Sequence, residues 1–189
     1  MINRIFRLCY FCYLKLARKN LSVGNNVRID IQTKIDNRAN TLVLGNNVYL
    51  RSMSKGYHAA MPFPSCILMD KKDARVEIGD NCRINGTYIH AQKSIKIGKN
   101  TVIAAGTQII DTNGHETIST DRTKGRDTPQ AIEIGENVWI GLNSIILKGT
   151  SIGKNSVVGA NSVVKGSFPD NSLILGNPAT LVKKLEIDQ

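Results

Sequence analysis

Residues 134–166 read IGENVWIGLNSIILKGTSIGKNSVVGANSVVKG, and an aliphatic residue returns at every sixth position of this stretch. The aliphatic positions are Ile134, Ile140, Ile146, Ile152, Val158 and Val164, and Gly135, Gly141, Gly153 and Gly159 follow four of them. A period of six fits neither the 3.6-residue period of an α-helix nor the two-residue alternation of a half-buried strand. It predicts a coil of three short strands, in which each coil stacks on the next around one shared core.

The same pattern continues upstream. Ile97, Ile103 and Ile109 keep the step of six, whereas the next position is occupied by His115. Further coils are marked by an aliphatic residue followed by glycine, at Val23-Gly24, Leu44-Gly45, Ile78-Gly79 and Ile97-Gly98. Asn or Asp stands close behind these glycines, and these residue types tolerate the left-handed backbone of tight corners. At a rise of about 4.8 Å per coil, about seven coils would form a prism about 35 Å long.

Composition and charge narrow the class of protein. A chain of 189 residues with 41% hydrophobic content favours one domain with a continuous core. Its four cysteines, Cys9, Cys12, Cys66 and Cys82, are scattered and no secretory signal is evident, so we expect reduced thiols in a cytoplasmic protein. The net charge of +10 is spread out without interleaved aromatic residues that stack on bases, which argues against nucleic acid as a partner. Small polyanionic ligands or an acidic membrane surface explain this charge at least as well.

Three segments depart from the repeat. Residues 1–21 are expected to form an amphipathic helix, too short and too charged to span a bilayer. This helix either covers the open end of the first coil or contacts an anionic membrane through residues 1–19. The coiled domain is expected over residues 22–175, with insertions at 51–65 and 111–130 and a C-terminal tail at 176–189. Since loops that interrupt a repeat tend to carry function, we expect His58 of the first insertion to line the substrate cleft.

A family resemblance rests on three stretches. Asn137-Val138-Trp139-Ile140-Gly141, the six-residue pattern up to Lys165 and the closing Leu175-Gly176-Asn177-Pro178-Ala179 resemble the hexapeptide-repeat acyltransferases. The likeness covers residues 70–185. Within the family, the sequence resembles most specifically the branch of maltose, galactoside and polysaccharide O-acetyltransferases. It implies an all-β fold, a left-handed parallel β-helix in the form of a three-sided prism. It also implies a homotrimer with acetyl-coenzyme A bound between neighbouring prisms.

The resemblance also implies a catalytic base. In that family a histidine on a loop that leaves a coil takes this role, and His115 matches its position. Imidazole, with an unperturbed pKa of about 6.5, is suited to take the proton of a sugar hydroxyl that attacks a thioester. Asp111 or Glu116 is expected to fix the tautomer of His115. Because no cysteine or serine lies in a convincing nucleophile motif, direct transfer is favoured over an acyl-enzyme.

Binding residues follow from the same resemblance. The acceptor is expected to contact Asn85, Asn113 and Trp139, and the indole of Trp139 is too large for the prism interior. The expected acetyl-CoA contacts are Trp139, Gly141, Gly159, Ala160, Lys165 and Lys183, with the two lysines meeting phosphate groups. Thr180 stands where the family has an arginine, and this departure from the family pattern bears on how strongly the 3′-phosphate of coenzyme A is bound.

These features favour an acetyl-CoA-dependent O-acetyltransferase that acts on a sugar or glycan hydroxyl in capsule, O-antigen or exopolysaccharide biosynthesis. We expect it in the cytoplasm, with the inner face of the cytoplasmic membrane as an open alternative. One alternative function is N-acetylation of an amino-sugar nucleotide, and another is a non-catalytic solenoid for binding or assembly. The histidines at 58, 90 and 115 lack the close pair that gamma-type carbonic anhydrases use for zinc, so no metal is expected.

Overall fold

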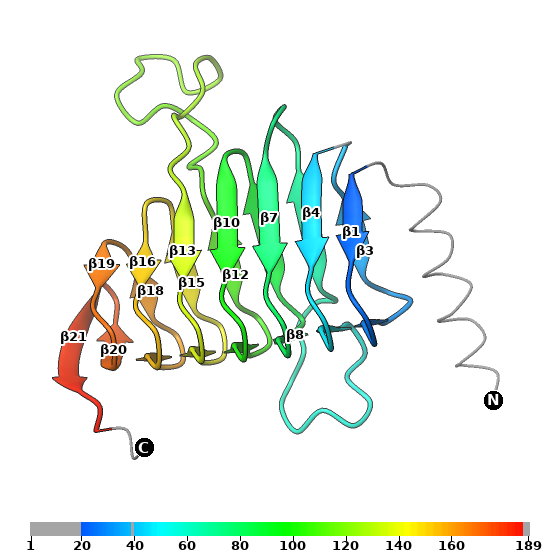
Figure 1. The fold of residues 1–189 in the computed structure, drawn as a ribbon. Coiled ribbons are helices and arrows are strands. Elements are labelled where there is room, and N and C mark those ends of the chain that lie inside the picture. Colours follow the sequence, from blue (N-terminus) through cyan, green and yellow to red (C-terminus); the bar gives the residue numbers. More distant parts are fainter. Residues whose placement is uncertain (1–19, 39, 187–189) are drawn as a thin grey trace.

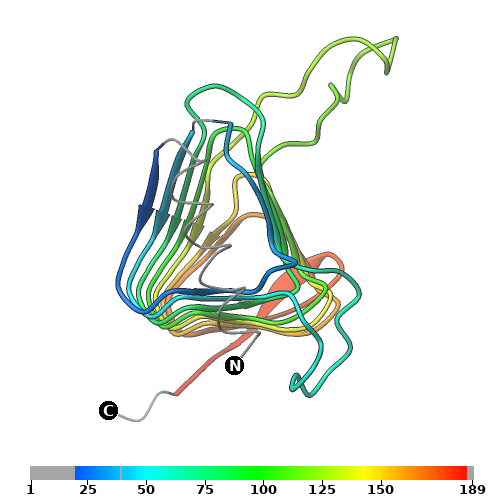
Figure 2. The same cartoon turned by 90° about the vertical axis from the view of Figure 1, so that its right-hand side faces the viewer.

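The computed structural model describes residues 20–38 and 40–186, and these form a three-sided prism of stacked coils (Figures 1 and 2). Up to the last strand, which folds back antiparallel, successive strands along the chain pass from one sheet to the next and pair in parallel with the strand one coil away. The fold is a left-handed parallel β-helix, as predicted. Residues 1–19, 39 and 187–189 lie outside the described part, and with them lies most of the helix predicted over residues 1–21.

Each side of the prism is one sheet. Sheet A contains β1 (Leu21–Val23), β4 (Thr41–Leu44), β7 (Arg75–Ile78), β10 (Ser94–Ile97), β13 (Ile132–Ile134), β16 (Ser151–Ile152) and β19 (Ser167–Phe168). Sheet B contains β2 (Arg28–Ile29), β5 (Tyr49–Arg51), β8 (Arg83–Asn85), β11 (Val102–Ile103), β14 (Trp139–Ile140), β17 (Val157–Val158), β20 (Ser172–Gly176) and β21 (Ala179–Lys184). Sheet C contains β3 (Lys34–Asp36), β6 (Cys66–Met69), β9 (Tyr88–Ala91), β12 (Gln108–Ile110), β15 (Ile145–Leu147) and β18 (Val163–Val164).

The six-residue step places one aliphatic side chain of each sheet in the core. Ile134, Ile140 and Ile146 belong to β13, β14 and β15, and their exposed fractions are 2%, 0% and 0%. In-register pairing stacks each of them on an equivalent residue of the next coil; Ile140, for example, lies between Ile103 and Val158. Burial of this aliphatic column is the main stabilising contribution to a fold whose coils contact only their neighbours.

The corner between sheets A and B explains the glycine and asparagine of the repeat. A Cβ at Gly98 would lie 2.5 Å from the carbonyl carbon of Gly135 in the next coil, so only glycine allows this close stacking. Two residues further on, Asn100 has a φ of 61°, in the left-handed region that asparagine adopts more readily than most residues. Its side chain accepts a hydrogen bond from Asn81 Nδ2 at 3.0 Å, as part of a ladder from coil to coil.

Both ends of the predicted coiled domain differ from the expectation. Leu21, placed in the predicted helix, is instead the first residue of β1 and pairs with Leu42. In the predicted C-terminal tail, β21 folds back antiparallel on β20, because the last strand of an open sheet offers unpaired backbone groups to a returning chain. Within the described part, no helix is long and apolar enough to cross a membrane.

The two insertions leave the prism at different corners. Residues 51–65 connect β5 of sheet B to β6 of sheet C, whereas residues 111–130 connect β12 of sheet C to β13 of sheet A. The view along the prism shows them projecting from separate corners, with sheet C between (Figure 2). This separation determines which functional groups a single chain brings together.

Candidate functional site

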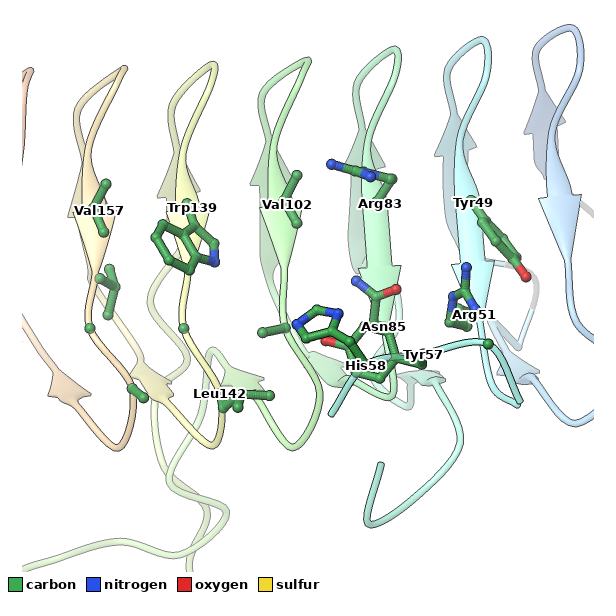
Figure 3. Close-up of a pocket in the computed structure, with 16 residues that line it drawn as sticks. Tyr49, Arg51, Tyr57, His58, Arg83, Asn85, Val102, Trp139, Leu142 and Val157 are labelled. Carbon is green, nitrogen blue, oxygen red and sulfur yellow. The ribbon is translucent and has the colours of Figure 1, made fainter. Parts of the chain in front are cut away.

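A cavity of about 630 Å³ lies against the outer face of sheet B, beneath the 51–65 insertion. Outward-facing side chains of neighbouring strands form its floor, among them Asn85 of β8, Val102 of β11 and Trp139 of β14 (Figure 3). Parallel in-register pairing brings these residues together although they are far apart in the sequence: Val102 pairs with both Arg83 and Trp139. The cavity therefore runs across several coils.

One end of the cavity gathers residues that the sequence predicted to contact acetyl-CoA. Trp139 is 56% exposed and points away from the core, as predicted from the narrow interior. Gly141, Gly159 and Ala160 line the wall beside it. Gly141 also has a packing role, because a Cβ there would lie 2.6 Å from the backbone nitrogen of Ala160. This end combines an exposed indole with exposed strand backbone and small residues.

Asn85, predicted to contact the acceptor, lies in the same cavity. Its side chain is fixed by a hydrogen bond from Nδ2 to the carbonyl oxygen of Ile103 at 2.8 Å. On sheet B, β8 is separated from β14 by β11 alone, so Asn85 and Trp139 lie two strands apart. The structure therefore brings the predicted acceptor residue and four predicted cofactor residues to one place.

The other end of the cavity contains residues that the sequence analysis missed. His58 lines it as expected, but Tyr49, Arg51 and Arg83 were not singled out. Tyr49 and Arg51 are the outward-facing residues of the strand that leads directly into the insertion. Their position just before the insertion could have identified them from the sequence, because an outward-facing side chain at the base of a loop also faces the space that the loop covers.

The 111–130 loop is anchored at its base by buried carboxylates. Asp111 is fully buried, and its two oxygens accept hydrogen bonds from the N–H groups of Gln92 and Lys93, both at 2.7 Å. Burial raises the pKa of Asp111, and these hydrogen bonds oppose that effect only in part. Its carboxylate therefore holds the loop to the neighbouring coil, and the part of the chain that the structure describes shows no contact between Asp111 and His115 to support the predicted orienting role.

A second carboxylate holds the segment before His115. Asp127 accepts a hydrogen bond from the N–H of Asn113 at 2.8 Å and forms an ion pair with the ammonium group of Lys148. Burial alone would raise the pKa of Asp127, but Asn113 and Lys148 hold it below its usual value. Asn113, predicted to bind substrate, thus has a structural role through its backbone. Lys148 and Asp127 are 21 residues apart, and no motif in the sequence connects them.

His115 is exposed on the loop and does not line the cavity. Among residues 20–38 and 40–186, it forms no hydrogen bond or ion pair with Asp111 or Glu116. Lys165 is exposed just after β18, and Lys183 lies on β21 at the far edge of sheet B. Within a single chain, the predicted base and both predicted phosphate-binding lysines therefore lie away from the cavity.

The remaining histidine and the described cysteines lie elsewhere. His90 Nε2 contacts Asp70 Oδ1 at 2.9 Å on the outer face of sheet C. Cys66 and Cys82 carry free thiols, and burial raises the pKa of Cys82 to about 11, so this thiol is unreactive at neutral pH. In the described ranges, no group of three or more His, Cys, Asp or Glu side chains is placed to hold a metal ion.

Comparisons with known proteins agree with the coiled fold. The family model "Hexapeptide repeat of succinyl-transferase" matches residues 75–110 and 131–165. The WbbJ protein of Escherichia coli (strain K12), whose name assigns it to O-acetyl transfer in lipopolysaccharide biosynthesis, is 40% identical over 115 residues, which are 56% of this chain and 58% of that protein. Protein CapG of Staphylococcus aureus is 41% identical over 115 residues, or 59% of this chain and 67% of that one.

A solved structure of a galactoside acetyltransferase in complex with coenzyme A superimposes with a TM-score of 0.60 at 25% identity, covering 87% of this chain and 65% of that one. The prism, its outward-facing cavity and the glycine-marked corners define a hexapeptide-repeat β-helix protein. The chain belongs to the hexapeptide-repeat acyltransferase family. It matches less than two thirds of the length of WbbJ, and the activity of the whole protein is treated as a proposal below.

Proposed function

We propose that this protein is an acetyl-CoA-dependent O-acetyltransferase that acetylates a sugar hydroxyl. The observation that carries this proposal is that one cavity holds Asn85 together with Trp139, Gly141 and Ala160. An exposed strand wall beside small residues suits the amide-containing pantetheine arm of coenzyme A. The solved relative that contains coenzyme A and the O-acetyl transfer named for WbbJ support the same reaction class.

The proposed chemistry is direct transfer. The imidazole of His115 takes the proton of the acceptor hydroxyl as its oxygen attacks the thioester carbonyl carbon. A backbone N–H group at a coil corner stabilises the oxyanion that develops. The C–S bond then breaks, and the leaving thiolate receives the proton from the imidazolium. Since His115 lies away from the cavity of its own chain, the proposal includes a homotrimer in which His115 of one copy reaches the cavity of the next.

The biological setting is also part of the proposal. The name of WbbJ supports a place in surface-polysaccharide biosynthesis, and we propose that the protein works in the cytoplasm. Contact with the inner face of the cytoplasmic membrane through residues 1–19 rests on their cationic, apolar sequence, because these residues lie outside the described part.

Deletion of residues 1–19 should reduce co-sedimentation with anionic vesicles and leave coenzyme A binding intact. Unchanged co-sedimentation would remove membrane contact from the proposal.

Acceptor profiling tests the reaction itself. The purified protein is incubated with acetyl-CoA and a panel of free, nucleotide-linked and lipid-linked sugars, and the products are identified by mass spectrometry. We expect an acetyl group in an ester that hydroxylamine removes. An amide that resists hydroxylamine, formed only on amino sugars, would replace the proposal with N-acetyl transfer. Failure of coenzyme A to bind the protein in calorimetry would instead favour a non-catalytic solenoid.

A further inference from the structure

The end of the cavity beneath the 51–65 insertion is cationic and aromatic. The guanidinium carbon of Arg51 lies 4.8 Å from the ring centroid of Tyr49 and 5.7 Å from that of Tyr57. Arg83 lines the same end and is the register partner of Tyr49. In the described part of the chain, neither arginine forms an ion pair with a carboxylate, and the buried Nε of Arg51 has no hydrogen-bond partner. Within the described residues, two guanidinium groups therefore line a cavity without being ion-paired to a carboxylate.

This end is built before any ligand arrives. The buried Asp30 accepts a hydrogen bond from the hydroxyl of Tyr49 at 3.3 Å. The N–H group of Ala105 donates to the hydroxyl oxygen of Tyr57 at 3.3 Å, which ties the insertion to the second coil beyond its own along sheet B. Both rings that flank Arg51 are thus fixed from outside the cavity. A preorganised site loses little conformational entropy when it binds a ligand.

The cationic end adjoins the predicted acceptor residue. Arg51 and Asn85 are register partners on β5 and β8, and Figure 3 shows Arg51, Asn85 and His58 grouped at this end. Asn85 lies between Arg51 and the Trp139 end in the strand order of sheet B. An acceptor sugar at Asn85 would therefore have coenzyme A on one side and Arg51 on the other, with Arg83 two residues before Asn85 on β8.

We propose that Arg51 and Arg83 bind the phosphate or diphosphate group of the acceptor, so that the substrate class is a glycosyl phosphate. This inference rests on the proposed acetyl transfer and specifies its acceptor. The planar fork of arginine matches phosphate oxygens in a bidentate arrangement, and stacking against Tyr49 and Tyr57 holds the plane of Arg51. A nucleoside diphosphate sugar and a lipid-linked glycosyl diphosphate share this chemistry.

Matched pairs of probes test the phosphate site without knowledge of the sugar. Calorimetry compares uridine diphosphate with uridine, and sedimentation compares phosphatidylcholine vesicles containing a polyprenyl diphosphate with vesicles containing the polyprenol. At least one phosphorylated probe should bind, and its partner should not. Arg51→Gln and Arg83→Gln should each weaken that binding by about tenfold to a hundredfold, the usual effect of losing a hydrogen bond to a charged group. The probe that binds identifies the source of the phosphate.

Coenzyme A and a distant arginine serve as controls. Coenzyme A affinity should change by less than about twofold in Arg51→Gln, and Arg75→Gln on sheet A should change neither binding by more than that. Loss of coenzyme A affinity in Arg51→Gln, with the phosphorylated probes unaffected, would assign this end to the cofactor and overturn the inference. Coenzyme A binding without binding of either phosphorylated probe would overturn it while sparing the proposed function. If Arg51→Gln does not fold, binding of the phosphorylated probes to Arg83→Gln, a change at an exposed residue, tests the inference instead.

Discussion

His115 shows how far a single residue can be interpreted from its place in a repeat. The step of six runs from Ile97 through Ile109 to position 115, where the chain leaves the prism and imidazole replaces an aliphatic side chain. The structure fixes the segment just before it, through Asp127 and the N–H group of Asn113, but gives His115 no partner within the described chain. The backbone before His115 is therefore held, while the imidazole is left free to contact a substrate.

Replacement of this histidine tests the proposed base. His115→Ala should lower kcat by about 10²- to 10⁴-fold, the usual contribution of general-base assistance. Coenzyme A affinity should remain unchanged in calorimetry, because the proposed cofactor contacts, such as Trp139 and Gly141, do not include His115. The variant should also lose the acid limb of the pH–rate profile, which reports protonation of the catalytic base. Thr117→Ala, in the same exposed loop, is the matched control. A His115→Ala enzyme within about threefold of the parent on the true acceptor would contradict the assignment.

At the scale of elements, hydrogen bonds between asparagine side chains link neighbouring coil corners over two stretches of the prism. Asn81 accepts a hydrogen bond from Asn47 Nδ2 at 2.9 Å and donates one to Asn100 Oδ1 at 3.0 Å. Its φ of 59° lies in the left-handed region, which costs most residues about 1–3 kcal/mol. One side-chain type therefore satisfies both the turn and the stacking of coils.

Two substitutions separate these contributions. Asn81→Ala loses the ladder bonds and strains the backbone, so we expect it to lower the free energy of unfolding by about 1–3 kcal/mol. Asn81→Gly loses the same bonds but adopts a positive φ without strain, and it should destabilise less. Urea unfolding followed by circular dichroism measures both, with the exposed Lys96→Ala as control. An equal loss in the two variants would show that the backbone conformation contributes nothing.

The base of the 111–130 loop should respond to acid. The pKa of Asp127 is lower in the folded protein than its ordinary value of 3.8, so the ionised carboxylate stabilises the fold at neutral pH. This contribution is lost as the pH falls below about 4 and through the folded-state pKa. Thermal melting of the parent and Asp127→Asn should differ most at neutral pH and converge in acid. A difference that grew on acidification would contradict this sign. Glu133→Gln, exposed on β13, is the control.

The sequence predicted the repeating elements better than the connections between them. A step of six with glycine at the corners determines sheet, register and inward face together, so the stacked coils and the two breaks in the repeat were predicted from it, whereas the left-handed β-helix was implied by the family resemblance. The ion pair of Lys148 with Asp127 joins a coil to a loop and follows no period. The pairing of β21 with β20 depends on an edge that exists only after the prism has formed. Arg51 was missed for the same reason, since its surroundings come from the folded insertion.

At the scale of the whole molecule, the two halves of the proposed site lie at different corners of one prism. The cavity is on sheet B beside the 51–65 insertion, and the His115 loop leaves from the corner of sheets C and A (Figure 2). Ile118, on the same loop, is 86% exposed. A second copy of the chain placed against sheet B would provide both the base and a surface for Ile118.

This arrangement predicts that two inactive variants restore each other. His115→Ala keeps an intact cavity, and Trp139→Ala keeps an intact base. In every trimer that contains both variants, one of the three interfaces pairs an intact His115 with an intact Trp139, so the isolated mixed trimers should recover about a third of the parent activity. Co-expression with two affinity tags isolates the mixed trimers, and light scattering confirms their mass. Mixing the proteins after purification, without exchange of subunits, is the control and should stay inactive. Activity confined to a monomer would show that the site does not form between copies. Mixed trimers that remain inactive would show the same, provided that each variant folds and His115→Ala binds coenzyme A.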